Sequence, residues 1–123
     1  MPRAIVNSTP IILLAGIGRL SLLPKLYDRI LIPNAVYEEV TAKADLASRA
    51  ISGHPSWLTV ERAPELPREQ RRLISAKLHA GEIKVMSLAL SSDADVVVLD
   101  DRAARKTAKF FGLPVTGTLG LLL

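Results

Sequence analysis

The sequence has no cysteine, and this absence excludes disulfide-stabilised domains and thiolate metal sites. It suits a reducing compartment, so we expect a cytoplasmic protein. Only two histidines are present, His54 and His79, which makes a histidine-based zinc site unexpected. Any bound metal should therefore be a hard cation held by carboxylate oxygens.

Long apolar runs are also missing. No stretch approaches the roughly 18 apolar residues that a membrane span needs. The segment "IILLAGIG" resembles part of a short signal peptide, but the polar residues 7–10 separate it from the start of the chain. We expect it to be core, and we expect no contact with a membrane.

The remaining composition is that of a folded, slightly basic domain. With 123 residues, 49% of them hydrophobic and 23% charged, the chain is predicted to form one domain with one core. Its formal net charge of +4 and pI near 9.8 favour an anionic partner such as nucleic acid.

Short apolar strands alternate with helical segments along the chain. Strands are expected at 3–7, 29–32, 56–61, 94–99 and 113–117, and helices at 8–18, 20–27, 34–51, 68–80, 82–90 and 101–112. Ser8 or Thr9 is placed to cap the first helix, and Gly81 is expected to break the helix that precedes it. The alternation predicts an α/β fold with a mostly parallel sheet of four to five strands, covered by helices on both faces.

Polar residues follow two predicted strands of this sheet. In "VVVLDDRAAR" the buried strand runs directly into Asp100 and Asp101, and Asn7 ends the first strand. Ligands of parallel sheets collect beyond the carboxyl ends of the strands, so we expect Asn7 and Asp100 on one rim.

Two glutamates are predicted to face inward from helices. At about 100° per residue, Glu38 lies opposite the stripe formed by Val36 and Val40, whereas Glu39 sits beside that stripe. Glu82 carries apolar residues three, four and seven positions later, and it should therefore lie on a buried face. A buried carboxylate is costly unless it is paired or metal-bound.

Each acid also has an ordinary structural explanation. Glu82 could complement a helix dipole, either aspartate could cap the next helix, and Glu39 could pair with Lys43. Taken together, the acids at strand ends and inward helix faces favour a functional cluster. Clustered carboxylates need a cation, and an all-oxygen site suits Mg²⁺ or Mn²⁺, as one ion or two. Such a metal would activate water for attack on a phosphodiester.

These segments resemble a known family. The blocks "IVNSTPIILLAGIGRLSLL", "ILIPNAVYEEV", "AGEIKVMSLAL" and "VVVLDDRAARKTAKFFGLPVTGTLG" are similar, in this order, to PIN-domain proteins of the branch related to VapC-type toxins. The resemblance implies a three-layer α/β/α sandwich and Mg²⁺- or Mn²⁺-dependent cleavage of RNA. It also implies a homodimer and a small antitoxin partner.

The resemblance assigns roles to individual residues. Glu39, Glu82 and Asp100 match the family's catalytic, metal-holding acids, with Asp101 as an additional ligand or a helix cap. Asn7 stands where the family usually has an aspartate, and the lost charge weakens metal affinity. Thr9 or Ser8 would hold a metal-bound water or the first-strand side chain. The chain is also expected to lack the C-terminal helices of its relatives.

If RNA is the substrate, basic side chains should flank the acids. Arg102 and Arg105 follow them directly, and we expect these two, with Thr9, to bind substrate. A basic run on the helix at 68–80, formed by Arg68, Arg71, Arg72 and Lys77, is more typical of a solvated face. Two rival functions remain: a PIN-like scaffold that binds partners without catalysis, and, with little support, a phosphoacceptor domain in which "LDD" carries the phosphate.

Overall fold

The computed structural model describes residues 2–76 and 78–123. Within them, five strands form one sheet in the order β3-β2-β1-β4-β5, and every neighbouring pair is parallel. The strands are β1 (Arg3–Val6), β2 (Arg29–Pro33), β3 (Leu58–Glu61), β4 (Val96–Val98) and β5 (Val115–Thr116). This confirms the predicted parallel sheet.

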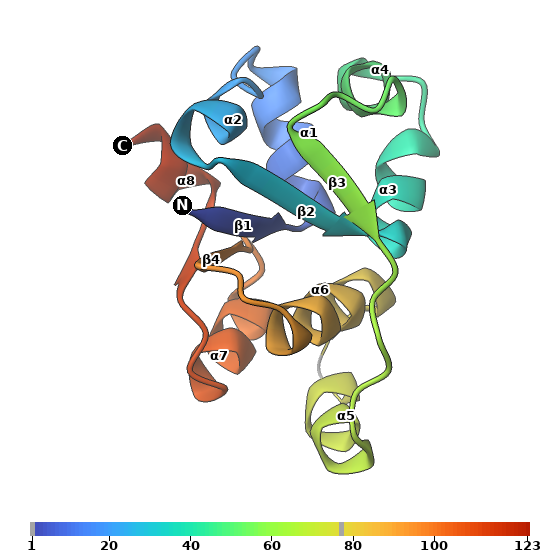
Figure 1. Ribbon diagram of the computed structural model, residues 1–123, viewed down its shortest axis with the longest axis vertical. Coiled ribbons are helices and arrows are strands. Elements are labelled where there is room, and N and C mark those ends of the chain that lie inside the picture. Colours follow the sequence, from blue (N-terminus) through green and yellow to red (C-terminus); the bar gives the residue numbers. More distant parts are fainter. Residues whose placement is uncertain (1, 77) are drawn as a thin grey trace.

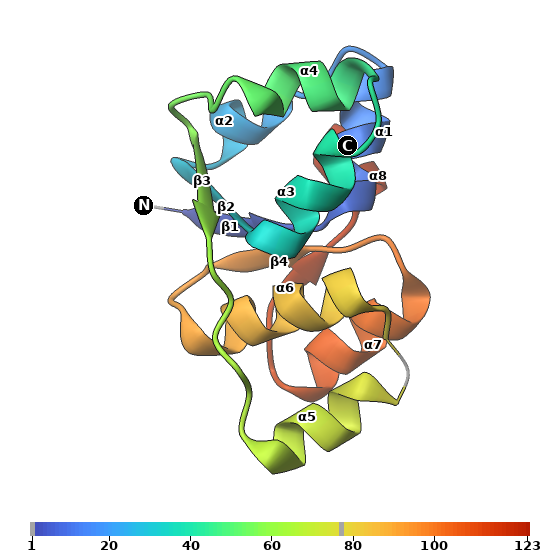
Figure 2. The same ribbon diagram turned by 90° about the vertical axis from the view of Figure 1, so that its right-hand side faces the viewer.

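Helices cover both faces of the sheet, as Figures 1 and 2 show. One layer contains α1 (Ser8–Gly16), α2 (Leu22–Leu26), α3 (Asn34–Thr41), α4 (Leu46–Ser52) and α8 (Thr118–Leu122). The other layer contains α6 (Ala80–Ser91) and α7 (Arg102–Phe110), with α5 (Arg68–Ser75) outside them. The architecture is the expected three-layer α/β/α sandwich.

The strand order reverses beside β1, and this reversal positions the site. From β1 the chain moves outward to β2 and β3, and it then returns to the other side of β1 to form β4 and β5. In such sheets a crevice opens at the carboxyl ends of the two strands where the order reverses. Those ends are joined here by a 3.1 Å hydrogen bond from the Asn7 N–H to the Val98 carbonyl oxygen.

The central strands are buried on both faces, which explains their continuous apolar sequences. Ala4, Ile5 and Val6 of β1 are fully buried. Helices on both sides contribute fully buried partners, among them Leu14 from α1 and Val85 from α6. The apolar sheet therefore holds the strand ends in fixed positions.

Two predictions about helices were wrong. The expected helix at 34–51 is two helices, because α3 ends at Thr41 and Asp45 starts α4 by accepting a 2.9 Å hydrogen bond from the Ser48 N–H. Gly81 does not break a helix, since α5 ends at Ser75 and Gly81 lies in the first turn of α6. Because Gly81 has no side chain, the start of α6 can lie close to Glu39 of α3.

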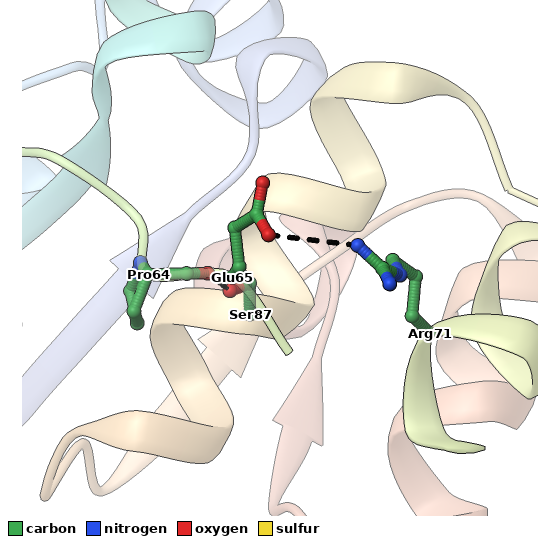
Figure 3. A network of polar contacts seen from close by, with 4 residues as sticks. All are labelled: Pro64, Glu65, Arg71 and Ser87. Carbon is green, nitrogen blue, oxygen red and sulfur yellow. Dashed lines mark hydrogen bonds and ion pairs between the residues drawn. The ribbon is translucent and has the colours of Figure 1, made fainter. Parts of the chain in front are cut away.

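Side-chain contacts anchor the segment that precedes α5 (Figure 3). The hydroxyl of Ser87, a buried residue of α6, donates a hydrogen bond to the Pro64 carbonyl oxygen. Arg71 of α5 forms an ion pair with Glu65, at 3.5 Å between Nη1 and Oε2. These contacts tie the start of α5 to α6.

Candidate functional site

A small cavity of about 130 Å³ lies at the carboxyl end of β1. Three parts of the chain line it: the β1–α1 junction, α3 and the start of α6. The lining residues are Asn7, Ser8, Thr9, Glu39, His79, Gly81 and Glu82. The structure thus brings together five residues that the sequence had marked: Asn7, Ser8, Thr9, Glu39 and Glu82.

Asn7 occupies the position before the first residue of α1, but its side chain does not cap the helix. Only 5% of the residue is exposed, and its Oδ1 is buried without a hydrogen-bond partner among the described residues. Ser8 and Thr9 are the first two residues of the helix itself, so the prediction that one of them caps it was wrong. A buried amide oxygen without a partner is costly, and this cost marks Asn7 as a candidate ligand-binding residue.

Glu39 reaches the cavity from α3. The residue is exposed overall, yet its Oε1 accepts a 2.9 Å hydrogen bond from the Ser8 hydroxyl. Glu39 does not form the alternative ion pair with Lys43. The ion pair found among residues 2–76 and 78–123 joins Arg71 to Glu65. Oε1 also lies 3.1 Å from the position that a Cβ on Gly81 would take. Glycine at this position lets α6 begin beside the Glu39 carboxylate.

Glu82 is buried, with 7% of its surface exposed, as the apolar pattern around it predicted. It stands in the first turn of α6, and its Oε1 accepts a 3.0 Å hydrogen bond from the His79 N–H. The residue therefore stabilises the start of the helix and also lines the cavity. His79 itself is exposed.

Asp100 lies just beyond the carboxyl end of β4, on the rim that the sheet geometry predicted. Its carboxylate turns toward α8. Oδ1 accepts a 2.7 Å hydrogen bond from the Thr118 N–H, and Oδ2 accepts a 2.5 Å hydrogen bond from the Thr118 hydroxyl. Asp100 consequently does not line the cavity shared by Glu39 and Glu82.

The acidic and basic residues that follow Asp100 have different contacts. Asp101 caps α7, since its Oδ2 accepts a 2.9 Å hydrogen bond from the Ala104 N–H. Arg102 and Arg105 line a second hollow of about 400 Å³ together with Asp100. Of the basic run on the earlier helix, Arg68, Arg71 and Arg72 are exposed, and Lys77 lies outside the described residues.

Most side-chain donors around the small cavity are oxygens, and His79 adds an imidazole. In residues 2–76 and 78–123 no three Asp, Glu, His or Cys side chains converge closely enough to hold a metal ion by themselves. Glu39, Glu82 and Asn7, whose amide oxygen has no partner among these residues, do line one cavity. That set fits Mg²⁺, which is usually held by one or two carboxylates and keeps several of its waters.

A family model described as a PIN domain matches residues 3–123, nearly the whole chain. The chain belongs to the PIN-domain family. A comparison with curated proteins finds no match. Membership in this family identifies a nuclease-type domain, and it confirms the resemblance at the level of the fold. No helix in the described part of the chain is long and apolar enough to cross a membrane.

Sequence reasoning missed several residues of this PIN domain. Thr118, which holds both oxygens of Asp100, belongs to the signature "LPVTGTLG", but it had been given no role. The basic residues Lys106 and Lys109 line the hollow beside Asp100. Their spacing from Arg102, by four and seven positions, places them on the same helix face and could have revealed them.

Proposed function

We propose that this PIN domain is a Mg²⁺- or Mn²⁺-dependent endoribonuclease of the VapC toxin type. The observation that carries the proposal is the unpartnered, buried Oδ1 of Asn7. Asn7 lines a cavity that Glu39 and Glu82 also line, at the strand ends where ligands of parallel sheets bind.

The proposed metal ligands are the oxygens that meet at this cavity. Asn7 would contribute its amide oxygen, and Glu39 and Glu82 their carboxylates. A bound divalent cation would supply charge stabilisation and an activated water for phosphodiester hydrolysis. The Ser8 hydroxyl fixes one Glu39 oxygen and leaves the other available. The His79 N–H does the same for Glu82.

The hollow beside Asp100 would receive the substrate. Arg102 and Arg105 line it and can bind phosphate oxygens, Arg105 approaching the backbone at Gly117. The two hydrogen bonds from Thr118 orient the Asp100 carboxylate. We propose that Asp100 acts as the third catalytic acid and that it does so from this fixed position, with Thr9 at the exposed mouth of the cavity.

Cleavage of a labelled RNA tests the proposal directly. The assay compares Mg²⁺ and Mn²⁺ with an EDTA control and uses the variants Glu82→Gln and Asp100→Asn. We expect metal-dependent cleavage that falls at least 100-fold in both variants, since each removes a charge needed at the site. A matched control is Asp93→Asn, which changes an exposed carboxylate in a loop. Metal-independent cleavage, or equal rates in all variants, would reject this function.

A scaffold that binds partners without catalysis is the second candidate. Two features favour it: the resemblance implies an aspartate where this chain has Asn7, and both oxygens of Asp100 accept hydrogen bonds from Thr118. An inactive parent chain that gains metal-dependent cleavage through Asn7→Asp would support this candidate. The cytoplasmic location, the homodimer and the small antitoxin remain predictions that belong with the toxin-type proposal.

A further inference from the structure

Four basic side chains lie along one face of α7. Arg102, Arg105, Lys106 and Lys109 are spaced by three, four and seven positions, which places them on one helical stripe. All four line the hollow beside Asp100. No carboxylate forms an ion pair with them, because the pair found within residues 2–76 and 78–123 is that of Arg71 and Glu65. The stripe is therefore a basic surface about 10 Å long, with Asp100 at its edge.

An apolar groove of about 880 Å³ borders the basic stripe, between α5 and α7. Arg102 and Lys106 line both the groove and the hollow, so the two features are continuous. Both phenylalanines of the chain, Phe110 and Phe111, line the groove. Phe110 is 75% exposed, an unusual position for a large apolar side chain.

The aromatic pair has a defined geometry. The rings of Phe110 and Phe111 meet edge to face, with centroids 5.2 Å apart and an interplanar angle of 90°. Phe111 is only partly exposed and packs against the core, so it orients its exposed neighbour. Leu73, which is 60% exposed on α5, lines the same groove. The contacts of Pro64 and Glu65 tie α5 to α6 (Figure 3).

We propose that this surface binds unpaired nucleotides outside the cavity at Asn7. Phosphates would lie on the basic stripe of α7, and a base would stack on Phe110 in the groove between α5 and α7. Proteins that bind single strands combine a positive groove with exposed aromatic rings in this way. The positive charge of the basic stripe favours a polyanion. The exposed ring of Phe110 favours an accessible base, which a duplex does not offer. Only the identity of the strand as RNA rests on the proposed function.

Binding of a labelled, unstructured RNA by fluorescence anisotropy tests the inference. EDTA is present throughout, so that the result does not depend on cleavage. Phe110→Ala should weaken binding about five-fold or more, because base stacking on an aromatic ring is lost. Leu46→Ala is the matched control, since Leu46 is 58% exposed on α4 in the opposite layer. It should change binding less than two-fold.

The phosphate contacts have a separate signature. Lys106→Ala and Lys109→Ala should each lower the slope of log K against log salt concentration by about 0.7, the value for one phosphate of a single strand. Lys25→Ala on α2 should leave the slope unchanged. Duplex RNA of the same sequence should bind with no dependence on Phe110.

Three outcomes would overturn the inference. They are no binding by the parent chain at low salt, equal affinities for Phe110→Ala and Leu46→Ala, and a Phe110 effect that is the same for duplex and single strand. Equal affinities would instead point to a protein partner for the groove, with an acidic amphipathic segment. If the parent chain binds the RNA but does not cleave it with Mg²⁺ or Mn²⁺, the nuclease proposal is rejected and the binding inference is retained.

Discussion

At the residue scale, Gly117 controls how Asp100 is held. A Cβ at this position would lie 2.9 Å from Asp100 Oδ1, 3.0 Å from Arg105 Nη1 and 3.3 Å from the Leu99 carbonyl oxygen. The first contact is too close for a real side chain, and the last is with backbone that cannot easily move. Glycine is therefore required for the Asp100 carboxylate to accept both hydrogen bonds from Thr118.

Gly117→Ala should displace the Asp100 carboxylate. We expect the free energy of unfolding to fall by about 1–3 kcal/mol, the usual cost of overpacking, and any nuclease activity to be lost. Urea denaturation and the RNA cleavage assay measure the two effects. Gly16→Ala is the control, because a Cβ there meets nothing within 4 Å. If Gly117→Ala matched that control in both assays, the close approach would have no consequence.

The neutral side chain of Asn7 can be examined without an activity assay. Asn7→Asp adds a third carboxylate to a cavity that Glu39 and Glu82 already line. In EDTA the variant should melt at a lower temperature than the parent, because a buried charge is added without a cation. Mg²⁺ at about 100 times its Kd should then restore about 2.7 kcal/mol by mass action.

The control for this experiment is Asn34→Asp, which adds the same charge at the exposed first residue of α3. Its melting temperature should respond to Mg²⁺ as the parent does. If Asn7→Asp showed no larger response to Mg²⁺ than Asn34→Asp, the cavity would not be the metal site.

At the element scale, the sequence predicted the sheet better than the helix boundaries. The apolar runs at Ala4–Val6 and Val96–Val98 were predicted as strands and are strands, and their polar ends mark the rim. The break between α3 and α4 could not be read from the sequence, because Ala42 and Ala44 are good helix formers. The chain turns there and Asp45 starts a new helix, so that α4 packs beside α1 and α3.

The candidate site was predicted in the same uneven way. Helical periodicity correctly predicted that Glu82 is buried. The predicted strand ends correctly placed Asn7 and Asp100 on one rim. The orientation of Asp100 depends on Thr118, which lies 18 residues later, and a local pattern does not report such a contact. The hydrogen bond from Ser8 to Glu39 likewise could not be predicted from a local pattern, because the two residues belong to different helices.

Asp101 connects an element to the site, and its two predicted roles can be separated. As the cap of α7 it satisfies the Ala104 N–H, so Asp101→Ala should lower the free energy of unfolding by about 1 kcal/mol. Asp45→Ala removes the equivalent cap of α4 and should cost a similar amount. Asp101→Asn should retain most of the stability, since asparagine is an equally good cap. Urea denaturation measures all three variants.

The same variants decide whether Asp101 also holds a metal. If the residue is only a cap, the stabilisation by Mg²⁺ should be equal in Asp101→Ala and in the parent, when measured as a shift in melting temperature. A Mg²⁺ shift that disappears in Asp101→Ala but persists in Asp45→Ala would assign it as a metal ligand.

At the scale of the whole molecule, apolar side chains are exposed in the layer opposite α7. Leu13 and Ile17, at the end of α1, are 49% and 58% exposed, and Leu119 of α8 is 71% exposed. Helices α1 and α8 lie side by side in Figure 2, so these exposed residues come from neighbouring elements. A second copy of the chain would cover them, which is consistent with the homodimer expected from the family resemblance.

Leu119→Glu should convert such a dimer into a monomer, because it places a charge in the apolar contact of both copies at once. Size-exclusion chromatography with light scattering would report the mass across a range of concentrations. Leu73→Glu is the control, since Leu73 is similarly exposed at 60% but lies on α5, on the far side of the sheet. A parent chain of monomer mass, or a dimer that survives Leu119→Glu and dissociates with Leu73→Glu, would contradict this interface. The second result would place the contact on the groove between α5 and α7, where it would compete directly with the nucleotides proposed to bind at Phe110.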